Sequence, residues 1–208
     1  MSLRSLLLLP LVWIVMATAS ESAQADDRLL DDFSRDDGRS SLGPVWSGFT
    51  DRVMGGRSDM QAGYVETEEG PALRMRGTVR LDNNGGFVQV RLPLVIDGEP
   101  LDASDAAGFV VEARGAPGPY YLHLRTPDTR RPWAYYRAPL AVTDEWARIE
   151  VPLAEFEPVS TRARLDASRL SSVGLVAYGE EFEADLEVRR LALKGAADSA
   201  DSDTAGDR

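Results

Sequence analysis

The feature that most constrains the fold is an alternation of apolar and polar residues with a period of two. In the segment 73–81 the apolar set alternates with the polar set: Leu73, Met75, Val79 and Leu81 against Arg74, Arg76, Thr78 and Arg80. Glycine, proline, asparagine and aspartate interrupt such runs at short intervals, which is typical of turns between short antiparallel strands. Further strands are predicted over 109–112, 120–126, 134–138, 147–153, 173–178 and 182–193.

These strands predict an all-β fold, a two-sheet antiparallel β-sandwich of the jelly-roll type. Its core is expected to consist of the alternate side chains of each strand that point inward. Helical periodicity is almost absent, and the short-helix candidate 165–170 is interpreted as a turn over the end of a sheet. In the last strand the apolar parity changes after Val188, which predicts a β-bulge at Arg189 and Arg190. No repeat of 20 to 50 residues is visible, so a propeller or solenoid is not expected.

Both ends of the chain are predicted to lie outside this domain. Residues 1–25 have the pattern of a secretory signal peptide: Arg4, then an apolar run, then small residues, with cleavage expected after Ala25 or alternatively after Ala19. The apolar run is shorter than the roughly 20 residues of a membrane span, so retention as an anchor is the less favoured alternative. Residues 195–208 contain four aspartates and no large apolar residue, which predicts a disordered acidic tail. The domain 26–194 is therefore expected to be periplasmic or secreted, with no membrane span.

The composition excludes several classes of function. The 208 residues include no cysteine and one histidine, which removes thiolate chemistry and multi-histidine metal sites. A formal net charge of -11 argues against nucleic acid or an anionic membrane as the partner. No Gly-x-Ser-x-Gly elbow occurs, Ser58 has no identifiable base, and neighbouring acids such as Glu180 and Glu181 would point to opposite faces of a strand. We predict no catalytic residue, no metal site and no cofactor; no EF-hand spacing occurs and no calcium ligand set can be named.

Two loop motifs stand out between the predicted strands. The first follows Trp46 and consists of Asp51, Arg52, Val53, Met54, Gly55, Gly56, Arg57 and Ser58; the second consists of Asn83, Asn84, Gly85, Gly86 and Phe87. The second motif tolerates the positive φ angles of a tight hairpin, although its asparagine amides could instead face a polar ligand at the rim of the sandwich. In the first motif Asp51 is expected to pair with Arg52 or Arg57 and so clamp its loop. The glycines do not have the spacing of a phosphate-binding loop.

In this order the two motifs resemble the complex I intermediate-associated protein 30 family, a galactose-binding-like β-sandwich. The resemblance covers roughly residues 30–193 and continues through segment 121–125, Trp146, segment 149–153, Phe156 and the strand from Val173. The best-known members are chaperones that assemble respiratory complex I, and related domains resemble carbohydrate-binding modules. The resemblance therefore implies a module without catalytic activity. The chaperone role lies on the mitochondrial matrix side, whereas the predicted signal peptide exports this chain.

A hairpin predicted over 120–138 forms a candidate ligand platform. If its loop is 127–131, six side chains share one face: Tyr121, His123, Arg125, Trp133, Tyr135 and Arg137. In this register Arg125 lies opposite Trp133, His123 opposite Tyr135, and Tyr121 opposite Arg137, while Leu122 and Leu124 point to the core. The face offers rings for stacking and donors for hydroxyls or carboxylates. The alternative is a solvated face on which arginines stack on aromatic rings for local stability.

A second basic face carries Arg74, Arg76 and Arg80, which are expected to pair with nearby acids rather than to recognise an anionic ligand. Taken together, the sequence predicts an exported, non-catalytic binding or assembly module that holds an envelope protein or a polar ligand. The alternatives are a carbohydrate-binding module of the cell envelope and, less favoured, a glycoside hydrolase built from distant carboxylates.

Overall fold

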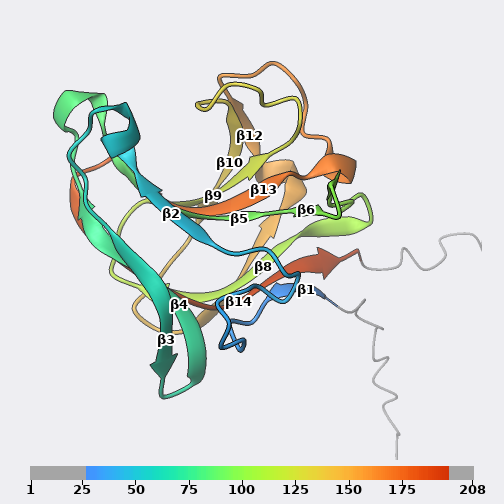
Figure 1. Ribbon diagram of the computed structural model, residues 1–208, viewed down its shortest axis with the longest axis horizontal. Helices are drawn as coiled ribbons and strands as arrows, with labels where there is room; N and C mark the ends of the chain where they lie inside the picture. Colours follow the sequence, from blue (N-terminus) through green and yellow to red (C-terminus); the bar gives the residue numbers. More distant parts are fainter. Residues whose placement is uncertain (1–26, 197–208) are drawn as a thin grey trace, which may run out of the picture.

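The computed structural model describes residues 27–196 and shows a β-sandwich of two six-stranded antiparallel sheets (Figure 1). The first sheet has the order β11-β8-β14-β4-β3, with β1 also paired to β14, and the second has the order β12-β10-β9-β13-β5-β2. This confirms the predicted jelly-roll sandwich. The predicted signal peptide with its cleavage sites at Ala19 and Ala25, and the tail beyond residue 196, lie outside the described residues.

The strands of the first sheet are β1 (Arg28–Asp31), β3 (Gln61–Thr67), β4 (Gly70–Val79), β8 (Ala106–Gly115), β11 (Ala147–Pro152) and β14 (Phe182–Gly195). Those of the second sheet are β2 (Ser47–Thr50), β5 (Phe87–Pro93), β9 (Tyr120–Arg125), β10 (Tyr135–Leu140), β12 (Glu157–Val159) and β13 (Ser172–Tyr178). A small ribbon pairs β6 (Val95–Ile96) with β7 (Glu99–Pro100). Short 3-10 turns are η1 (Asp51–Met54), η2 (Asp82–Asn84), η3 (Leu153–Glu155) and η4 (Ala167–Arg169), the last of them inside the segment interpreted as a turn.

The core lies between the sheets and consists of side chains that the alternation predicts to point inward. Leu122 and Leu124 of β9 are 0% exposed, and Leu73 and Met75 of β4 are also buried. Each such side chain contributes roughly 1.5 to 3 kcal/mol by leaving water. Leu81 was expected to continue the inward set, but it is 47% exposed because β4 ends at Val79.

The segment between β4 and β5 corrects one prediction. It is not a tight hairpin: β4 pairs with β3 and β14 in the first sheet, whereas β5 pairs with β13 and β2 in the second. The chain crosses from one sheet to the other through η2, and this crossing needs backbone conformations that asparagine and glycine tolerate. The expectation of positive φ is confirmed at Asn83 (56°) and Gly86 (124°).

The predicted bulge in β14 is confirmed. Val188 pairs with Ala113 and Arg190 pairs with Glu112, so Arg189 is the extra residue in the ladder. At the bulge β14 also changes its other neighbour from β4 to β1. A β-bulge reverses the side-chain parity that follows it, which is why the apolar pattern of this strand changes phase.

The β9–β10 hairpin has the predicted parity but a different register. Arg137 lies opposite His123, and Pro139 lies opposite Tyr121, two residues away from the predicted pairing. The loop spans 126–134 rather than 127–131, because two turns close within it, from Thr129 N to Thr126 O and from Ala134 N to Arg131 O. Trp133 therefore lies in the loop and not on the strand. Within residues 27–196 we find no helix with the length and hydropathy of a bilayer span.

Candidate functional site

A cleft of about 660 Å³ lies on the outer face of the second sheet. Gln89, His123 and Ser172, contributed by three neighbouring strands, form part of its floor. The η1 loop and the β9–β10 loop rise on opposite sides of this face (Figure 1). Val53 and Trp133, one from each loop, line the cleft and are 70% and 55% exposed.

Strand pairing brings the polar residues of the floor into one row. Across β10, β9, β13 and β5, Arg137 lies opposite His123, His123 opposite Gly174, and Gly174 opposite Arg91. Gly174 leaves room for the amide of Gln89: a Cβ atom at this glycine would lie 2.2 Å from Gln89 Nε2. The row thus separates two arginines by one histidine and one glycine.

His123 is buried in the floor, with 7% of its surface exposed. Its ring stacks on Tyr135 with centroids 4.1 Å apart and planes inclined by 15°. Within the described chain its Nε2 has no hydrogen-bond partner. Burial, together with the positive charges of Arg137 and Arg91, lowers the pKa of His123 to about 3. The imidazole is therefore neutral at pH 7 and keeps a nitrogen free for a ligand.

Arg91 and Arg125 bring positive charge to the cleft. The guanidinium of Arg91 lies 4.5 Å from the centroid of the Phe49 ring, and no salt bridge joins it to an acid in residues 27–196. Burial and the nearby charge of Arg125 lower the pKa of Arg91 below its ordinary value. Both side chains are positively charged at pH 7, because a guanidinium group is in effect always protonated in proteins.

Arg125 also positions the loop that carries Trp133. Its Nη2 donates to the carbonyl oxygens of Thr129 and Arg131, the latter at 2.8 Å. Burial lowers the pKa of Arg125 as well. The ligand contact predicted for this side chain stays a prediction, whereas its hydrogen bonds to the loop are observed.

The structure brings together four of the six predicted platform residues: His123, Arg125, Trp133 and Tyr135 all line the cleft. Tyr121 and Arg137 have the same parity but do not line it. The Arg137 guanidinium lies 5.5 Å from the Tyr121 ring centroid, which is the stacking arrangement of the alternative interpretation.

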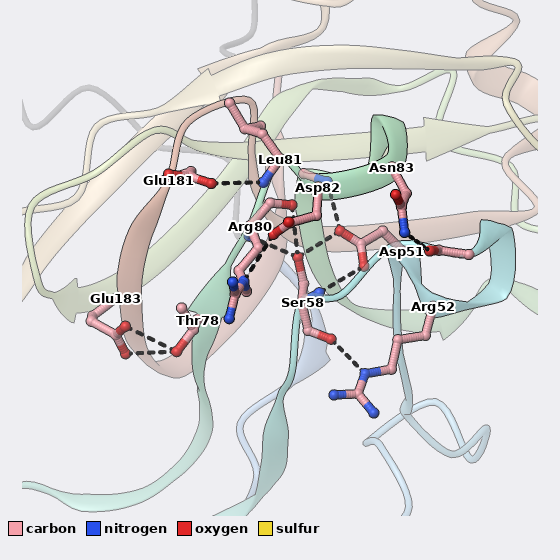
Figure 2. A network of polar contacts seen from close by, with 12 residues as sticks. Asp51, Arg52, Ser58, Thr78, Arg80, Leu81, Asp82, Asn83, Glu181 and Glu183 are labelled. Carbon is pink, nitrogen blue, oxygen red and sulfur yellow. Dashed lines mark hydrogen bonds and ion pairs between the residues drawn. The ribbon is translucent and has the colours of Figure 1, made fainter.

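The two loop motifs form one structure beside the cleft, organised by a fully buried Asp51 (Figure 2). Its carboxylate accepts hydrogen bonds from Ser58 N (3.0 Å), Ser58 Oγ (2.5 Å) and Gly86 N (2.6 Å). The predicted pairing of Asp51 with Arg52 or Arg57 is wrong. Arg52 Nε instead donates to Ser58 O at 2.9 Å, because the carboxylate is already saturated by donors of the two motifs.

The remaining residues of these motifs serve the same structure. Gly55 ends η1 with φ 90°, and its carbonyl accepts a 3.1 Å bond from the Asn83 amide, so this amide is used within the loops. Gly56 and Gly85 lie so close to Asp51 that a Cβ atom would fall within 2.4 Å of its carboxylate group. Asn84 lies in η2. Phe87 and Gly85 reach the cleft wall.

Trp46 packs against Phe33 and Asp31 and does not line the cleft. Its Nε1 donates a 2.7 Å hydrogen bond to the buried Asp31, and its ring lies 5.9 Å from that of Phe33. Asp31 also accepts hydrogen bonds from the backbone of Phe33 and Ser41. Trp46 therefore stabilises the fold.

The second basic face is paired with acids, as predicted. Arg74 makes two hydrogen bonds to Asp185, at 2.8 and 2.6 Å, Arg76 lies 3.6 Å from the same carboxylate, and Arg80 lies 3.0 Å from Asp82. The hydrogen bonds from Arg74, together with the positive charges of Arg74 and Arg76, lower the pKa of Asp185.

Sequence reasoning missed the part of the cleft that comes from β5, β13 and β2. Arg91, Gln89 and Tyr178 line it, together with Phe49 from the edge strand. The signal was present in segment 87–93, where Phe87, Gln89 and Arg91 alternate with Val88, Val90 and Leu92. In the part of the chain that the structure describes, no group of three or more His, Asp or Glu side chains is placed to hold a metal ion.

Comparison with known proteins gives a family and a fold. The family model described as Complex I intermediate-associated protein 30 matches residues 32–188. The family 11 carbohydrate-binding module of a cellulosomal cellulase from Clostridium thermocellum superposes with a TM-score of 0.64 at 16% identity, over 82% of this chain and 95% of that chain. The same family of module in complex with a β-1,3-1,4-mixed-linked tetrasaccharide gives 0.62 at 14% identity, over 82% and 96%.

A family 30 carbohydrate-binding module from the same organism gives a TM-score of 0.53 at 13% identity, over 73% of this chain and 92% of that chain. A search of curated proteins found no match. At these identities the structural likeness establishes the galactose-binding-like sandwich fold.

Proposed function

This chain belongs to the complex I intermediate-associated protein 30 family, and we propose that it is an exported, non-catalytic module that binds a saccharide in the cleft of its second sheet. The observation that carries the proposal is the composition of the cleft. An exposed indole, Trp133, stands at the rim, and the floor holds Gln89 together with His123, whose buried Nε2 has no partner in the described chain.

A sugar ring presents an apolar face and several hydroxyl groups, and the cleft offers a complement to each. Aromatic faces such as those of Trp133 and Tyr178 stack on sugar rings, while amide, hydroxyl and imidazole groups exchange hydrogen bonds with the hydroxyls. A family 11 module of the same fold has been solved with a tetrasaccharide bound, which supports this choice of ligand.

The absence of acids from the cleft supports a binding role over hydrolysis. Most glycoside hydrolases place two carboxylates on either side of the scissile bond. Among the described residues that line the cleft there is no aspartate or glutamate. Ser58 Oγ, which hydrogen-bonds to the Asp51 carboxylate, is buried with it and holds the two loops together.

Export is the part of the proposal that rests on residues 1–25. Removal of this segment would release the sandwich domain, 26–194, into the periplasm or the medium. N-terminal sequencing of the protein recovered from the envelope fraction tests this directly. A mature chain that begins at Asp26 is expected, and an intact Met1 in the cytoplasmic fraction would contradict export.

A protein partner is the second candidate, and the apolar rim favours it. Val53, Met54 and Trp133 are 70%, 58% and 55% exposed around one opening. Exposed apolar groups gathered in this way are typical of surfaces that bind other proteins. An assembly factor of the cell envelope would use the rim, whereas a saccharide-binding module would use the floor.

Binding to a panel of neutral and acidic oligosaccharides, measured by calorimetry, separates the two candidates. Trp133→Ala is expected to weaken saccharide binding by about tenfold or more, because it removes the exposed stacking surface. Val95→Ala is the control, since Val95 is a 40% exposed apolar residue that does not line the cleft. Absence of saccharide binding, with capture of an envelope protein that requires Val53 and Met54, would favour the second candidate.

A further inference from the structure

The cleft differs in charge from the rest of the protein. The chain carries a formal net charge of -11, and several arginines outside the cleft form salt bridges with acids, as Arg74 does with Asp185 and Arg189 with Glu112. The cleft contains two arginines, Arg91 and Arg125, and none of its described lining residues is acidic. Positive charge is thus concentrated in one concave site of an acidic protein.

The two guanidinium groups are held in place without a negative partner. The guanidinium of Arg91 stacks on the Phe49 ring, 4.5 Å from its centroid, and the pairing of β5 with β13 holds the backbone of Arg91 in place. Arg125 is fixed by the loop carbonyls that its Nη2 binds, and its Nη1 donates no hydrogen bond within the described chain. Partly buried charges that lack a counter-charge are costly unless something else compensates them.

The uncharged groups beside the arginines are also free to bind. His123 is only 7% exposed, and its Nε2 has no hydrogen-bond partner within residues 27–196. Its neighbour Gln89, 5% exposed, makes no side-chain hydrogen bond in the described chain. A site with fixed charges, a free amide and a free imidazole nitrogen is pre-organised for a ligand that carries both an anionic group and hydroxyls.

We infer that the cleft selects an acidic saccharide, a chain that contains uronic acid, and that its carboxylate binds between Arg91 and Arg125. This inference rests on the proposed function and adds the chemical class of the sugar. A guanidinium forms two parallel hydrogen bonds to a planar carboxylate, so the arginines supply geometry as well as charge. Gln89 and the neutral His123 ring bind hydroxyls of the same or the neighbouring sugar, and Trp133 stacks on the ring.

Other anionic partners fit the molecule less well. A nucleic acid or an anionic membrane presents many charges over a wide surface, and the net charge of -11 would repel both. A short uronic-acid chain carries only a few charges, and the carboxylate that enters the cleft meets the local charge of the two arginines. Debye screening confines that local interaction to about 10 Å at moderate salt, which matches a carboxylate seated directly against the arginines.

The test compares oligosaccharides that differ only in their carboxylates. Tetramers of galacturonate, glucuronate and mannuronate are titrated into the protein by calorimetry, each beside the neutral sugar obtained by reducing its carboxyl groups. At least one acidic tetramer is expected to bind about tenfold or more tightly than its reduced form. That preference is expected to shrink as salt is added.

Variants locate the effect. Arg91→Gln is expected to lower the affinity for the acidic tetramer by about tenfold or more and to leave that for the reduced form unchanged. Arg91→Lys keeps the positive charge but lacks the planar guanidinium group. Its affinity for the acidic tetramer is expected to lie between those of the natural protein and Arg91→Gln. The control is Arg76→Gln, which removes a side chain that is 63% exposed on the other sheet and should leave both affinities unchanged. Thermal melts of each variant show that the fold is kept.

The outcomes separate this inference from the proposed function. Equal affinity for acidic and reduced tetramers would overturn acidic selectivity and leave saccharide binding standing. If neither the acidic nor the reduced tetramers bind, both the acidic selectivity and the proposed saccharide binding are overturned. Loss of affinity in Arg76→Gln as large as in Arg91→Gln would show a general charge effect and would also overturn the assignment to the cleft.

Discussion

Asp51 Oδ2 accepts a 2.6 Å hydrogen bond from the backbone nitrogen of Gly86, 35 residues further along the chain. The same oxygen accepts a 2.5 Å bond from Ser58 Oγ. A single buried carboxylate therefore joins the two glycine-containing motifs, which lie apart in the sequence (Figure 2). Because Val53 and Met54 lie in η1, the same short turn that begins at Asp51, this junction also sets the position of one wall of the cleft.

Replacing Asp51 by alanine should destabilise the protein by roughly 2 to 4 kcal/mol, because the buried donors of Ser58 and Gly86 lose their acceptor. Urea denaturation of the two proteins measures the difference. Asp105→Ala is a matched control, since the Asp105 side chain is 79% exposed, and it should change stability by no more than about 0.5 kcal/mol. Equal effects of the two substitutions would refute the central role of Asp51.

The glycines around this carboxylate give a second prediction. A Cβ atom at Gly56 would lie 2.3 Å from Asp51 Cγ, whereas nothing lies within 4 Å of a Cβ atom at Gly63 in β3. Gly56→Ala is expected to cost about 1 to 3 kcal/mol through steric displacement of the buried carboxylate. Gly63→Ala should be neutral or slightly stabilising, because it restricts the unfolded chain. Thermal melts decide this, and a neutral Gly56→Ala would show that the loop has room to adjust.

The fold was largely predictable because the period-two pattern reports directly which side chains are buried. Leu122, Leu124 and Met75 lie in the core as the alternation predicts. The pattern does not report which strands pair. The link from β4 to β5 has the residues of a hairpin, yet it crosses between sheets, because glycine and asparagine allow positive φ in either setting.

The site was predicted in part, and the missing part has a physical reason. His123 and Tyr135 are near in sequence, so local parity placed them on one face. Arg91 reaches the same row only because β13 lies between β9 and β5, a long-range pairing that the order of residues does not specify. The register of the β9–β10 hairpin was wrong by two residues, because turns at Thr129 and Ala134 lengthen the loop beyond its predicted bounds.

His123 should make stability depend on pH. In the unfolded chain the imidazole titrates near 6.5, and in the fold its pKa is lowered to about 3. Between these values the unfolded state binds a proton that the folded state does not, so stability is complete above about pH 6.5 and falls as the pH falls. The loss should reach about 2 kcal/mol at pH 5, as the linkage relation gives for one group.

His123→Phe tests this dependence, since phenylalanine keeps the stacked ring on Tyr135 and has no titrating group. Urea denaturation between about pH 7 and 5 should show a slope in the natural protein and little slope in the variant. His123 is the single histidine of the chain, so no other imidazole contributes. Carboxylates with lowered pKa, such as Asp185 beside Arg74, destabilise the fold in the same direction at lower pH, which is why the range stops at pH 5. The same slope in both proteins would contradict the assignment.

Gly174 offers a way to change the cleft without changing the core. It lies between His123 and Arg91 in the ladder, and a Cβ atom there would come 2.2 Å from Gln89 Nε2, the end of a flexible side chain. In Gly174→Ala the amide of Gln89 must therefore move into the cleft. We expect saccharide binding to weaken about tenfold, because the floor is refilled, while stability changes by less than about 1 kcal/mol. Calorimetric titration and thermal melts measure the two quantities on the same sample. Unchanged affinity would place the ligand away from this row, and a large loss of stability would show that the Gln89 side chain cannot move aside.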